Sequence, residues 1–205
     1  MATAAFWDKA AQKYAASPIK DMAAYEATLT RTRAYLSPTD HLLEVGCGTG
    51  STALKLADAV ARMTATDISG EMLAIAEGKR TTQGVANVTF RKQEITTPFP
   101  DTPYDAVCAF SILHLVDDLE ETLMHLRDAL KPGGYVISKT ACLKEMNIAI
   151  RMAIPVMRAI GLAPHVLRFS ASELERTFER CGFALVETGY FGSNTYARFI
   201  VAQKA

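Results

Sequence analysis

The chain has 205 residues, 49% of them apolar, and its 22 lysine and arginine residues balance 22 aspartate and glutamate residues. This length and composition fit one domain with a substantial core, and the zero net charge gives no general attraction to nucleic acid. The N-terminal segment carries Asp8 and Lys9 and has no apolar run, so we expect neither a signal peptide nor a membrane span, and a cytoplasmic protein.

The chain begins with segments of helical character and continues with short apolar runs that alternate with amphipathic ones. Residues 1–35 are expected to form an N-terminal helical cover of one or two helices, followed by a core over 36–140. Strands are predicted at 41–45, 63–67, 88–92, 105–110 and 135–140, and helices at 51–61, 70–84 and 119–131. This alternation predicts an α/β fold with a parallel sheet, helices on both faces and a ligand site at the carboxyl ends of the strands.

The last third of the chain departs from this alternation. Residues 141–170 are predicted to be a helical insert, whose helix at 144–163 is broken by Pro155. Residues 171–205 are expected to form a helix, which starts at Ser170 or Ser172 as N-cap, and a β-hairpin of strands 184–191 and 195–204 across "GSN". No repeat or linker divides the chain, so 1–205 is expected to be a single domain.

The cysteine and histidine patterns do not indicate a metal or disulfide framework. Four cysteines lie far apart with no CxxC pair, so we expect free and mostly buried thiols. His41, His125 and His165 have no metal-ligand spacing, and no metal site is predicted.

The stretch "LLEVGCGTG", from Leu42 to Gly50, has the spacing GxGxG directly after a predicted strand. Glycines let a backbone turn tightly and approach a ligand closely, although such a loop is also compatible with a simple tight turn. A dinucleotide-binding loop would place its third glycine at position 51, where this chain has Ser51. Asp67 ends the next strand, where nucleotide-binding α/β domains hold ribose hydroxyls; the alternative role is a helix N-cap, which Ser69 could equally fill.

Five segments taken together indicate a family. "LLEVGCGTG", "ATDIS", "PFPDTPYDAV", "SILHLVDD" and "LKPGGYVIS", in this order, resemble class I S-adenosylmethionine-dependent methyltransferases, in particular the small-molecule type that includes quinone methyltransferases. The resemblance covers roughly residues 35–140. It implies a Rossmann-like seven-stranded sheet, mostly parallel with an antiparallel last strand, and S-adenosyl-L-methionine as cofactor with S-adenosyl-L-homocysteine as product.

The resemblance also implies the cofactor contacts. The glycine loop would pass the methionine part, Asp67 would take the ribose hydroxyls, and the end of the fourth strand would meet the amino group. Ile68 and Met72 would sandwich the adenine, with a plain core role as the alternative for each. The family usually places an aspartate five residues before the proline of "PF"; this chain has Gln93 there and Glu94 next, and either one could accept from the adenine amine. The expected cofactor-binding residues are Glu44, Gly46, Cys47, Gly48, Gly50, Asp67, Ile68, Met72, Gln93, Glu94, Ile95, Phe110 and Ser111.

Methyl transfer from a sulfonium is an in-line displacement, in which alignment and desolvation carry most of the rate. A base matters only for an acceptor that must lose a proton, and His114 is the best-placed candidate, with a structural hydrogen-bonding role as the alternative. Tyr14 and Tyr25 are candidates for closing over the methyl group or for shaping the acceptor site, with simple packing as the alternative. The predicted function is methyl transfer to a small hydrophobic or aromatic acceptor.

Two other functions compete with this one. A non-catalytic cofactor-binding or partner-subunit protein of the same fold is the main alternative, and a nicotinamide dehydrogenase is disfavoured by Ser51. Nucleic-acid and protein acceptors are disfavoured because no recognition domain is added and "AFSI" (109–112) replaces an "NPPY"-type tetrapeptide. We expect a monomer or a homodimer.

The insert at 144–169 has three interpretations: a lid over an apolar acceptor, a dimer contact, or an interfacial helix that reaches a membrane-dissolved substrate. Its arginines fall seven residues apart on one face, and its apolar side chains form another. We favour the lid, without stable membrane insertion. The residues that carry this interpretation are Met146, Ile150, Arg151, Met152, Ile154, Met157 and Arg158.

Overall fold

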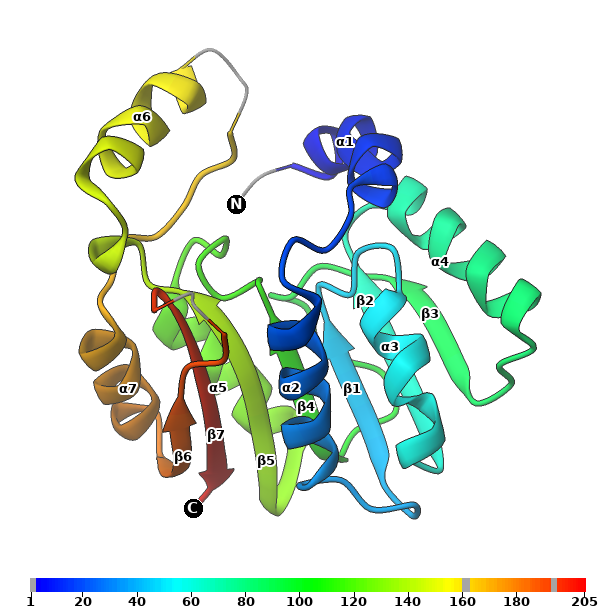
Figure 1. Ribbon diagram of the computed structural model, residues 1–205. Helices are drawn as coiled ribbons and strands as arrows, with labels where there is room; N and C mark the ends of the chain where they lie inside the picture. Colours follow the sequence, from blue (N-terminus) through cyan, green and yellow to red (C-terminus); the bar gives the residue numbers. More distant parts are fainter. Residues whose placement is uncertain (1–2, 160–162, 193–194) are drawn as a thin grey trace.

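The computed structural model describes residues 3–159, 163–192 and 195–205, which contain a seven-stranded sheet of order β3-β2-β1-β4-β5-β7-β6 (Figure 1). β7 is antiparallel to both of its neighbours, and the other pairs are parallel. This confirms the predicted Rossmann-like sheet with an antiparallel last strand. The strands are β1 His41–Val45, β2 Arg62–Asp67, β3 Val88–Lys92, β4 Tyr104–Phe110, β5 Leu130–Ala141, β6 Phe183–Gly189 and β7 Ala197–Lys204.

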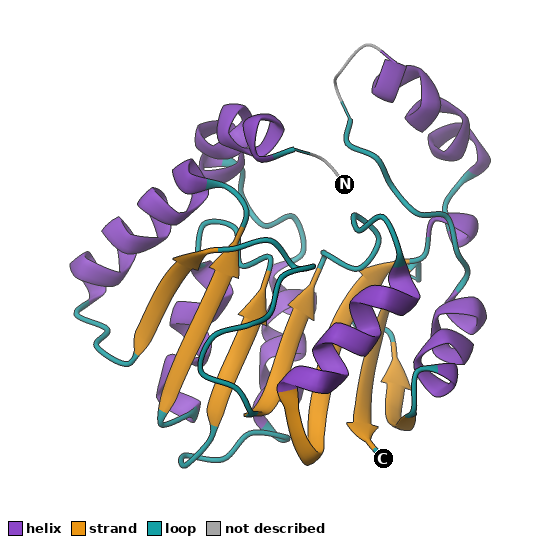
Figure 2. Cartoon of the chain, turned by 180° about the vertical axis from the view of Figure 1, so that it is seen from behind, coloured by secondary structure: helices purple, strands orange, loops and turns teal. Residues whose placement is uncertain are grey.

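Helices cover both faces of the sheet. Helices α2, α3 and α4 lie on one face, α5 and α7 lie on the other, and α1 and α6 stand above the carboxyl ends of the parallel strands (Figures 1 and 2). The predicted N-terminal cover is thus two helices. The α-helices are α1 Ala4–Ala16, α2 Met22–Arg33, α3 Ser51–Leu56, α4 Gly70–Gln83, α5 Leu119–Ala129, α6 Ile148–Ala159 and α7 Ala171–Arg180, and the short 3-10 helices are Ala57–Ala59 and Leu143–Glu145.

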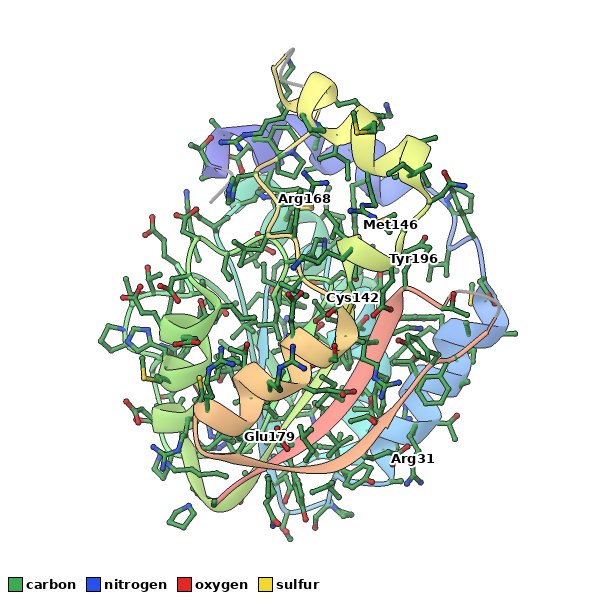
Figure 3. The ribbon with its side chains drawn as sticks, turned by 90° about the vertical axis from the view of Figure 1, so that its left-hand side faces the viewer. Arg31, Cys142, Met146, Arg168, Glu179 and Tyr196 are labelled. Carbon is green, nitrogen blue, oxygen red and sulfur yellow. The ribbon has the colours of Figure 1, made fainter. Side chains whose placement is uncertain are left out.

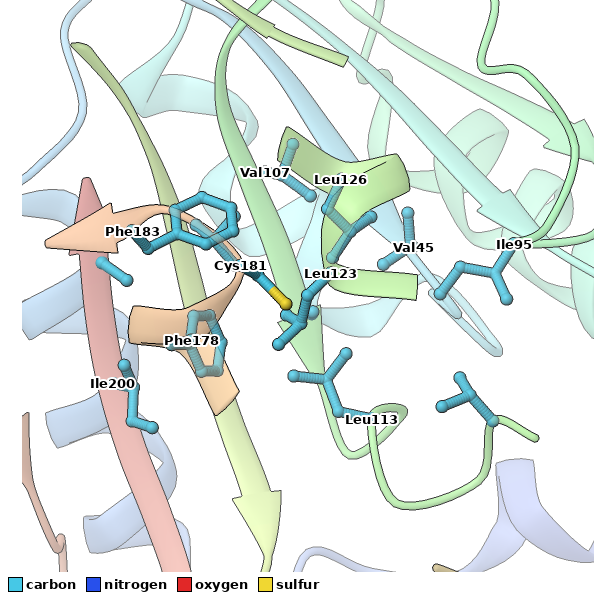
Figure 4. Packing of buried hydrophobic residues seen from close by; sticks show 14 of the residues in the cluster. Val45, Ile95, Val107, Leu113, Leu123, Leu126, Phe178, Cys181, Phe183 and Ile200 are labelled. Carbon is cyan, nitrogen blue, oxygen red and sulfur yellow. The ribbon is translucent and has the colours of Figure 1, made fainter. Parts of the chain in front are cut away.

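Two apolar layers hold the helices on the sheet. Figure 4 shows the layer under α5 and α7, where Leu123, Leu126 and Phe178 pack with Val107 and Ile200 of the strands. The opposite layer joins α2, α3 and α4 to the same strands. β1 is buried along its whole length and β4 along most of it, without the alternation of a strand that has one face in water. Such burial on both faces is typical of parallel sheets.

A loop takes the place of a helix between β3 and β4. Residues 93–103 contain Pro98, Pro100 and Pro103, each of which lacks the amide hydrogen that an α-helix needs. The loop covers the sheet by placing Ile95 and Phe99 in the apolar layer under α5.

Local capping explains where several helices begin. Ser69 Oγ accepts from the Met72 amide at 3.1 Å and starts α4. Ser170, rather than Ser172, is the N-cap of α7, and it forms a reciprocal capping box with Glu173. These side chains satisfy amide groups that have no partner within the helix.

Several predicted boundaries differ from the structure, among them that of the helix expected at 144–163, which begins as α6 only at Ile148. The helix expected at 51–61 ends at Leu56 and continues as a 3-10 turn, and β5 begins at Leu130 because the "KPGG" segment already pairs with the sheet. Pro155 lies inside α6 and does not end it, since a proline removes only its own bond to the carbonyl of Arg151. Residues 160–162 and 193–194, which include part of the predicted "GSN" turn, lie outside the described residues.

The four cysteines are buried and free, as their spacing predicted. No described helix combines the length and the hydropathy needed to span a membrane.

Candidate functional site

A cavity of about 590 Å³ opens at the carboxyl ends of β1, β4 and β5. Its walls come from the α1–α2 region, the glycine loop, the ends of β4 and β5, and the segment before β7. Ligands of α/β sheets bind at this edge. The lining residues used below are Tyr14, Asp21, Tyr25, Thr28, Glu44, Gly46, Cys47, Gly48, Lys79, Phe110, Ser111, His114, Lys139, Phe191 and Tyr196.

The three loop glycines have different roles. Gly46, Gly48 and Gly50 all have positive φ, at 66°, 53° and 72°. A Cβ on Gly46 would lie 2.8 Å from Ile112, and one on Gly50 would lie 2.7 Å from Ala76, so packing requires both glycines. A Cβ on Gly48 would meet only the Tyr14 ring at 3.8 Å. The middle glycine therefore leaves the backbone open toward the cavity.

Asp67 fixes this loop from the neighbouring strand. Its Oδ2 accepts from the Gly48 amide at 2.8 Å, and its Oδ1 accepts from the Ser69 amide at 2.9 Å. Burial raises the pKa of the Asp67 carboxyl, and the two amides oppose this rise. Since Ser69 caps α4, the capping alternative for Asp67 does not hold, and each of its oxygens keeps a second lone pair for a ligand.

Glu44 lies beneath the loop and is 2% exposed, although its side chain lines the cavity. Its Oε2 has no hydrogen-bond partner among the described residues. Burial, with a smaller contribution from the charge of Asp67, raises the pKa of the Glu44 carboxyl to about 8. A cationic group bound above the loop would satisfy this oxygen and favour the ionised form.

His114 follows the end of β4 and lines the same cavity. Its Nδ1 is buried without a partner among the described residues, and burial lowers the pKa of the imidazole to about 4. The ring is therefore neutral at pH 7 and can accept a hydrogen bond. Two neighbouring features fix its position: Ser111 is held at a φ of 55°, and the His114 carbonyl accepts from the Leu167 amide at 2.8 Å.

The N-terminal helices cover the site in two places. Tyr14 borders the cavity with 54% of the residue exposed, and the Tyr25 hydroxyl lies 3.2 Å from Thr52 Oγ1. Asp8 accepts from Ser69 Oγ at 2.5 Å and from the Glu71 amide at 3.2 Å, which attaches α1 to the start of α4. Nothing in the local sequence around Asp8 indicated this contact.

The predicted adenine side lies outside the cavity walls. Gln93 donates its side-chain amide to the carbonyls of Thr97 and Pro98, at 3.3 and 3.0 Å, so its amide oxygen is left for a donor. Ile95 is buried in the apolar core and offers a ligand only its backbone. The predicted residues that do not line the cavity are Gly50, Asp67, Ile68, Met72, Gln93, Glu94 and Ile95.

Two lysines at the site were missed by the sequence analysis. Lys79 Nζ donates to the Thr49 carbonyl and hydroxyl and to Ser51 Oγ, at 2.9 to 3.1 Å, and so braces the glycine loop. Lys139 lines the cavity. Its position near the end of a predicted strand could have indicated this from the sequence. Within the described ranges, no group of three His, Cys, Asp or Glu is arranged to hold a metal ion.

The model of the methyltransferase domain family matches residues 12–188. The highly reducing polyketide synthase ACRTS2 of Alternaria alternata is 32% identical over 123 residues, which cover 53% of this chain and 5% of that protein. The demethylmenaquinone methyltransferase of Tropheryma whipplei is 34% identical over 98 residues, which cover 48% of this chain and 40% of that protein. The chain therefore spans less than half of the length of these relatives.

Solved structures share the fold over most of the chain. A complex of the Haloferax volcanii Trm112 methyltransferase activator with a methyltransferase matches with a TM-score of 0.77 and 17% identity, covering 97% of both chains. The magnesium protoporphyrin IX methyltransferase of Synechocystis PCC 6803, with bound SAH, matches with a TM-score of 0.67 and 21% identity, covering 89% of this chain and 84% of that one.

Replacing Glu44 with glutamine should change how stability depends on pH. The pKa of Glu44 is about 8 in the folded chain, against an ordinary value of 4.5. As the pH rises, the carboxyl therefore loses its proton at a lower pH in the unfolded chain than in the folded one. The free energy of unfolding should therefore fall as the pH rises from 5 to 8, by on the order of 3 kcal/mol from this group. Urea unfolding of Glu44→Gln should lack this part of the decline, and the exposed control Glu26→Gln should keep it. Equal slopes in the two variants would contradict the assignment.

Proposed function

The chain belongs to the methyltransferase domain family, and we propose that it transfers the methyl group of S-adenosylmethionine to a small hydrophobic or aromatic acceptor. The observation that carries the proposal is the cavity wall formed by an open glycine loop, a buried carboxyl with an unpartnered oxygen, and the end of β4. This arrangement offers a place for a cationic donor and, beside it, room for an acceptor.

The residues present fit the cofactor. S-adenosylmethionine supplies a sulfonium-bound methyl group and carries an ammonium group, and the unpartnered Glu44 oxygen is suited to a cation. Gly48 leaves its backbone accessible to the methionine part, and Asp67 has lone pairs for the ribose hydroxyls. We propose that Ile68 and Met72 contact the adenine, and that Gln93 reads its amine through the free amide oxygen. Glu94 is the exposed alternative.

The cavity also has aromatic walls, which we assign to the acceptor. Tyr25, Phe110, Phe191 and Tyr196 line it, which supports an acceptor with an aromatic or extended apolar body. Relatives named as a demethylmenaquinone methyltransferase and as a highly reducing polyketide synthase support an acceptor of this kind. We propose that neutral His114 accepts a hydrogen bond from the acceptor and that Tyr14 closes over the methyl group.

The function is tested by binding and turnover. Wild-type protein should bind S-adenosylmethionine in isothermal titration and should release S-adenosylhomocysteine with at least one member of a panel of phenols, quinols and β-ketoacyl thioesters. Binding without turnover across the panel would favour the non-catalytic alternative. A protein that does not bind the cofactor would contradict both.

Replacing Asp67 with alanine should weaken cofactor binding by roughly 1–3 kcal/mol, the usual cost of losing a hydrogen bond to a charged group. The variant also loses the anchors to Gly48 and Ser69, so thermal unfolding is measured in parallel. Asp58→Ala, at an exposed carboxylate of the 3-10 turn after α3, is the matched control and should bind normally. Unchanged affinity in Asp67→Ala would remove Asp67 from the site.

The contacts and exposure of the segment around α6 support its interpretation as a lid. Its two ends are joined to each other, because the Lys144 amide donates to the Phe169 carbonyl at 3.2 Å and the Ala171 amide donates to Glu145 Oε1 at 2.7 Å. The helix itself stands away from the sheet (Figures 1 and 2), and Ile148 and Met152 are 64% and 67% exposed. Figure 3 shows Met146 and Arg168 beneath the helix, on the chain segments that lead to it and from it.

Deleting residues 146–162 and closing the gap with a short glycine bridge should retain cofactor binding and abolish turnover. The joined ends at Lys144 and Phe169 remain, so the core should fold. Full turnover would refute the lid, and loss of dimerisation or of liposome binding would favour a dimer contact or an interfacial helix.

A milder variant tests whether α6 closes over the cavity without removing the segment. The double substitution Ile150→Asn, Met157→Asn alters exposed apolar side chains of α6 and should lower kcat/KM about tenfold without changing the melting temperature. Val186→Asn, at an equally exposed position on the edge strand β6, is the control and should leave kcat/KM unchanged.

A further inference from the structure

Lys139 has a polar environment that does not balance its charge. It lies half-buried near the end of β5, and its Nζ donates to Thr28 Oγ1 at 2.9 Å. Thr28 is buried and donates its own proton to the Ala24 carbonyl at 2.7 Å, so its oxygen accepts from the lysine. The ammonium also lies 5.8 Å from the centre of the Phe191 ring. A hydroxyl and an aromatic ring stabilise a cation only weakly.

No carboxylate of the described residues lies within ion-pair distance of Lys139 Nζ, whereas Lys131 at the other end of the same strand pairs with Asp105. The negative charge of Asp21 raises the pKa of the Lys139 ammonium. Asp21 Oδ1, however, is the N-cap of α2, where it accepts from the Ala24 amide at 2.9 Å. Burial lowers the pKa of the Lys139 ammonium, and the charge of Asp21 only partly offsets this. A partly desolvated cation of this kind is stabilised by an anion.

The position of Lys139 places that anion on the acceptor side. Lys139 is paired in register with Phe110, and its carbonyl accepts from the Ser111 amide at 2.9 Å, directly before the turn that carries His114. Glu44 lies on β1, beyond β4. The cavity thus has its buried acid under the glycine loop and its unpaired ammonium across β4.

We propose that Lys139 pairs with an acidic group of the acceptor, so that the acceptor is an apolar small molecule carrying a carboxylate, an enolate or a phenolate. This inference rests on the proposed function and specifies its substrate class. A negative charge on the acceptor also raises the electron density of a nucleophilic oxygen or carbon conjugated with it, and it attracts the acceptor to a cavity that holds a cationic sulfonium.

A second source of the same chemistry is the carboxylate of the cofactor's methionine part. The two sources predict different behaviour, because a lysine that holds the cofactor affects cofactor binding in the absence of any acceptor. A lysine that holds the acceptor affects only the second ligand.

The experiment uses the full chain saturated with S-adenosylhomocysteine and titrated with matched aromatic probes. Benzoate, 4-hydroxybenzoate and 2-naphthoate are compared with their primary amides, which have nearly the same shape and no charge. The wild type should bind the carboxylates at least tenfold more tightly than the amides. Lys139→Met should lose this preference, and Lys139→Arg should keep part of it.

Lys131→Met is the matched control. Lys131 lies at the opposite end of the same strand, where it pairs with Asp105, and the variant should keep the wild-type preference. The affinity of Lys139→Met for S-adenosylhomocysteine should stay within about twofold of the wild type. Retained melting temperature shows that the variants fold.

Three results overturn the proposal: equal binding of acids and amides by the wild type, a preference for acids that survives in Lys139→Met, or a loss of S-adenosylhomocysteine binding in Lys139→Met, which would assign the lysine to the cofactor. A wild type that does not bind S-adenosylhomocysteine contradicts the proposed function instead. The same probes are then titrated against the free protein, and the comparison of acids with amides still decides the role of Lys139.

Discussion

The site depends on the common direction of β1, β2, β4 and β5. Parallel strands end at one edge of a sheet, so residues far apart in the sequence meet there without any local signal that joins them. The glycine loop follows β1, Asp67 ends β2, Ser111 follows β4 and Lys139 lies near the end of β5. Register then sets their spacing, because each pair of neighbouring strands is fixed by a hydrogen-bonded ladder and by burial on both faces.

Charge is distributed unevenly along this edge even though the whole chain is neutral. Glu44 and Asp67 gather at the β1–β2 side, and burial raises the pKa of both carboxyls. Lys139 stands at the β5 side, and burial lowers the pKa of its ammonium. Lys79 braces the glycine loop and Asp21 acts on Lys139, so each end also holds one charge of the opposite sign. Among the described residues, Glu44 Oε2 has no hydrogen-bond partner and Lys139 Nζ has no carboxylate partner. These two groups nevertheless favour the proposed cationic donor at the first end and the proposed anionic acceptor at the second. We infer that this asymmetry helps to orient the two ligands.

The sequence predicted the sheet because its central strands are short apolar runs separated by amphipathic helices, and the glycine loop because its spacing is a local property. It did not predict the attachment of Asp8 to Ser69, since those residues are brought together only by the path of α1 across the sheet edge. It also missed the pairing of "KPGG" with the sheet, because proline and glycine usually end regular structure. The sequence analysis overlooked Lys139 because it relied on motifs, and Lys139 belongs to none of them. That its ammonium lacks a carboxylate partner can be seen only in the three-dimensional structure.

The acceptor therefore has to be sought in the parts of the chain that carry no motif. The similarity to the demethylmenaquinone methyltransferase extends over 98 residues, about half of the chain. Residues of α1, α2 and the segment between them line the cavity beside the glycine loop. If the sheet edge positions the donor, as we propose, then the choice of acceptor depends on these covering segments and on side chains such as Lys139. A methyl transfer needs both ligands aligned and shielded from water. Helix α6 stands above the carboxyl ends of the parallel strands and away from the sheet (Figure 1). In the lid role that we propose for it, its closure would supply the shielding from water, while the proposed pair with Lys139 would supply the alignment.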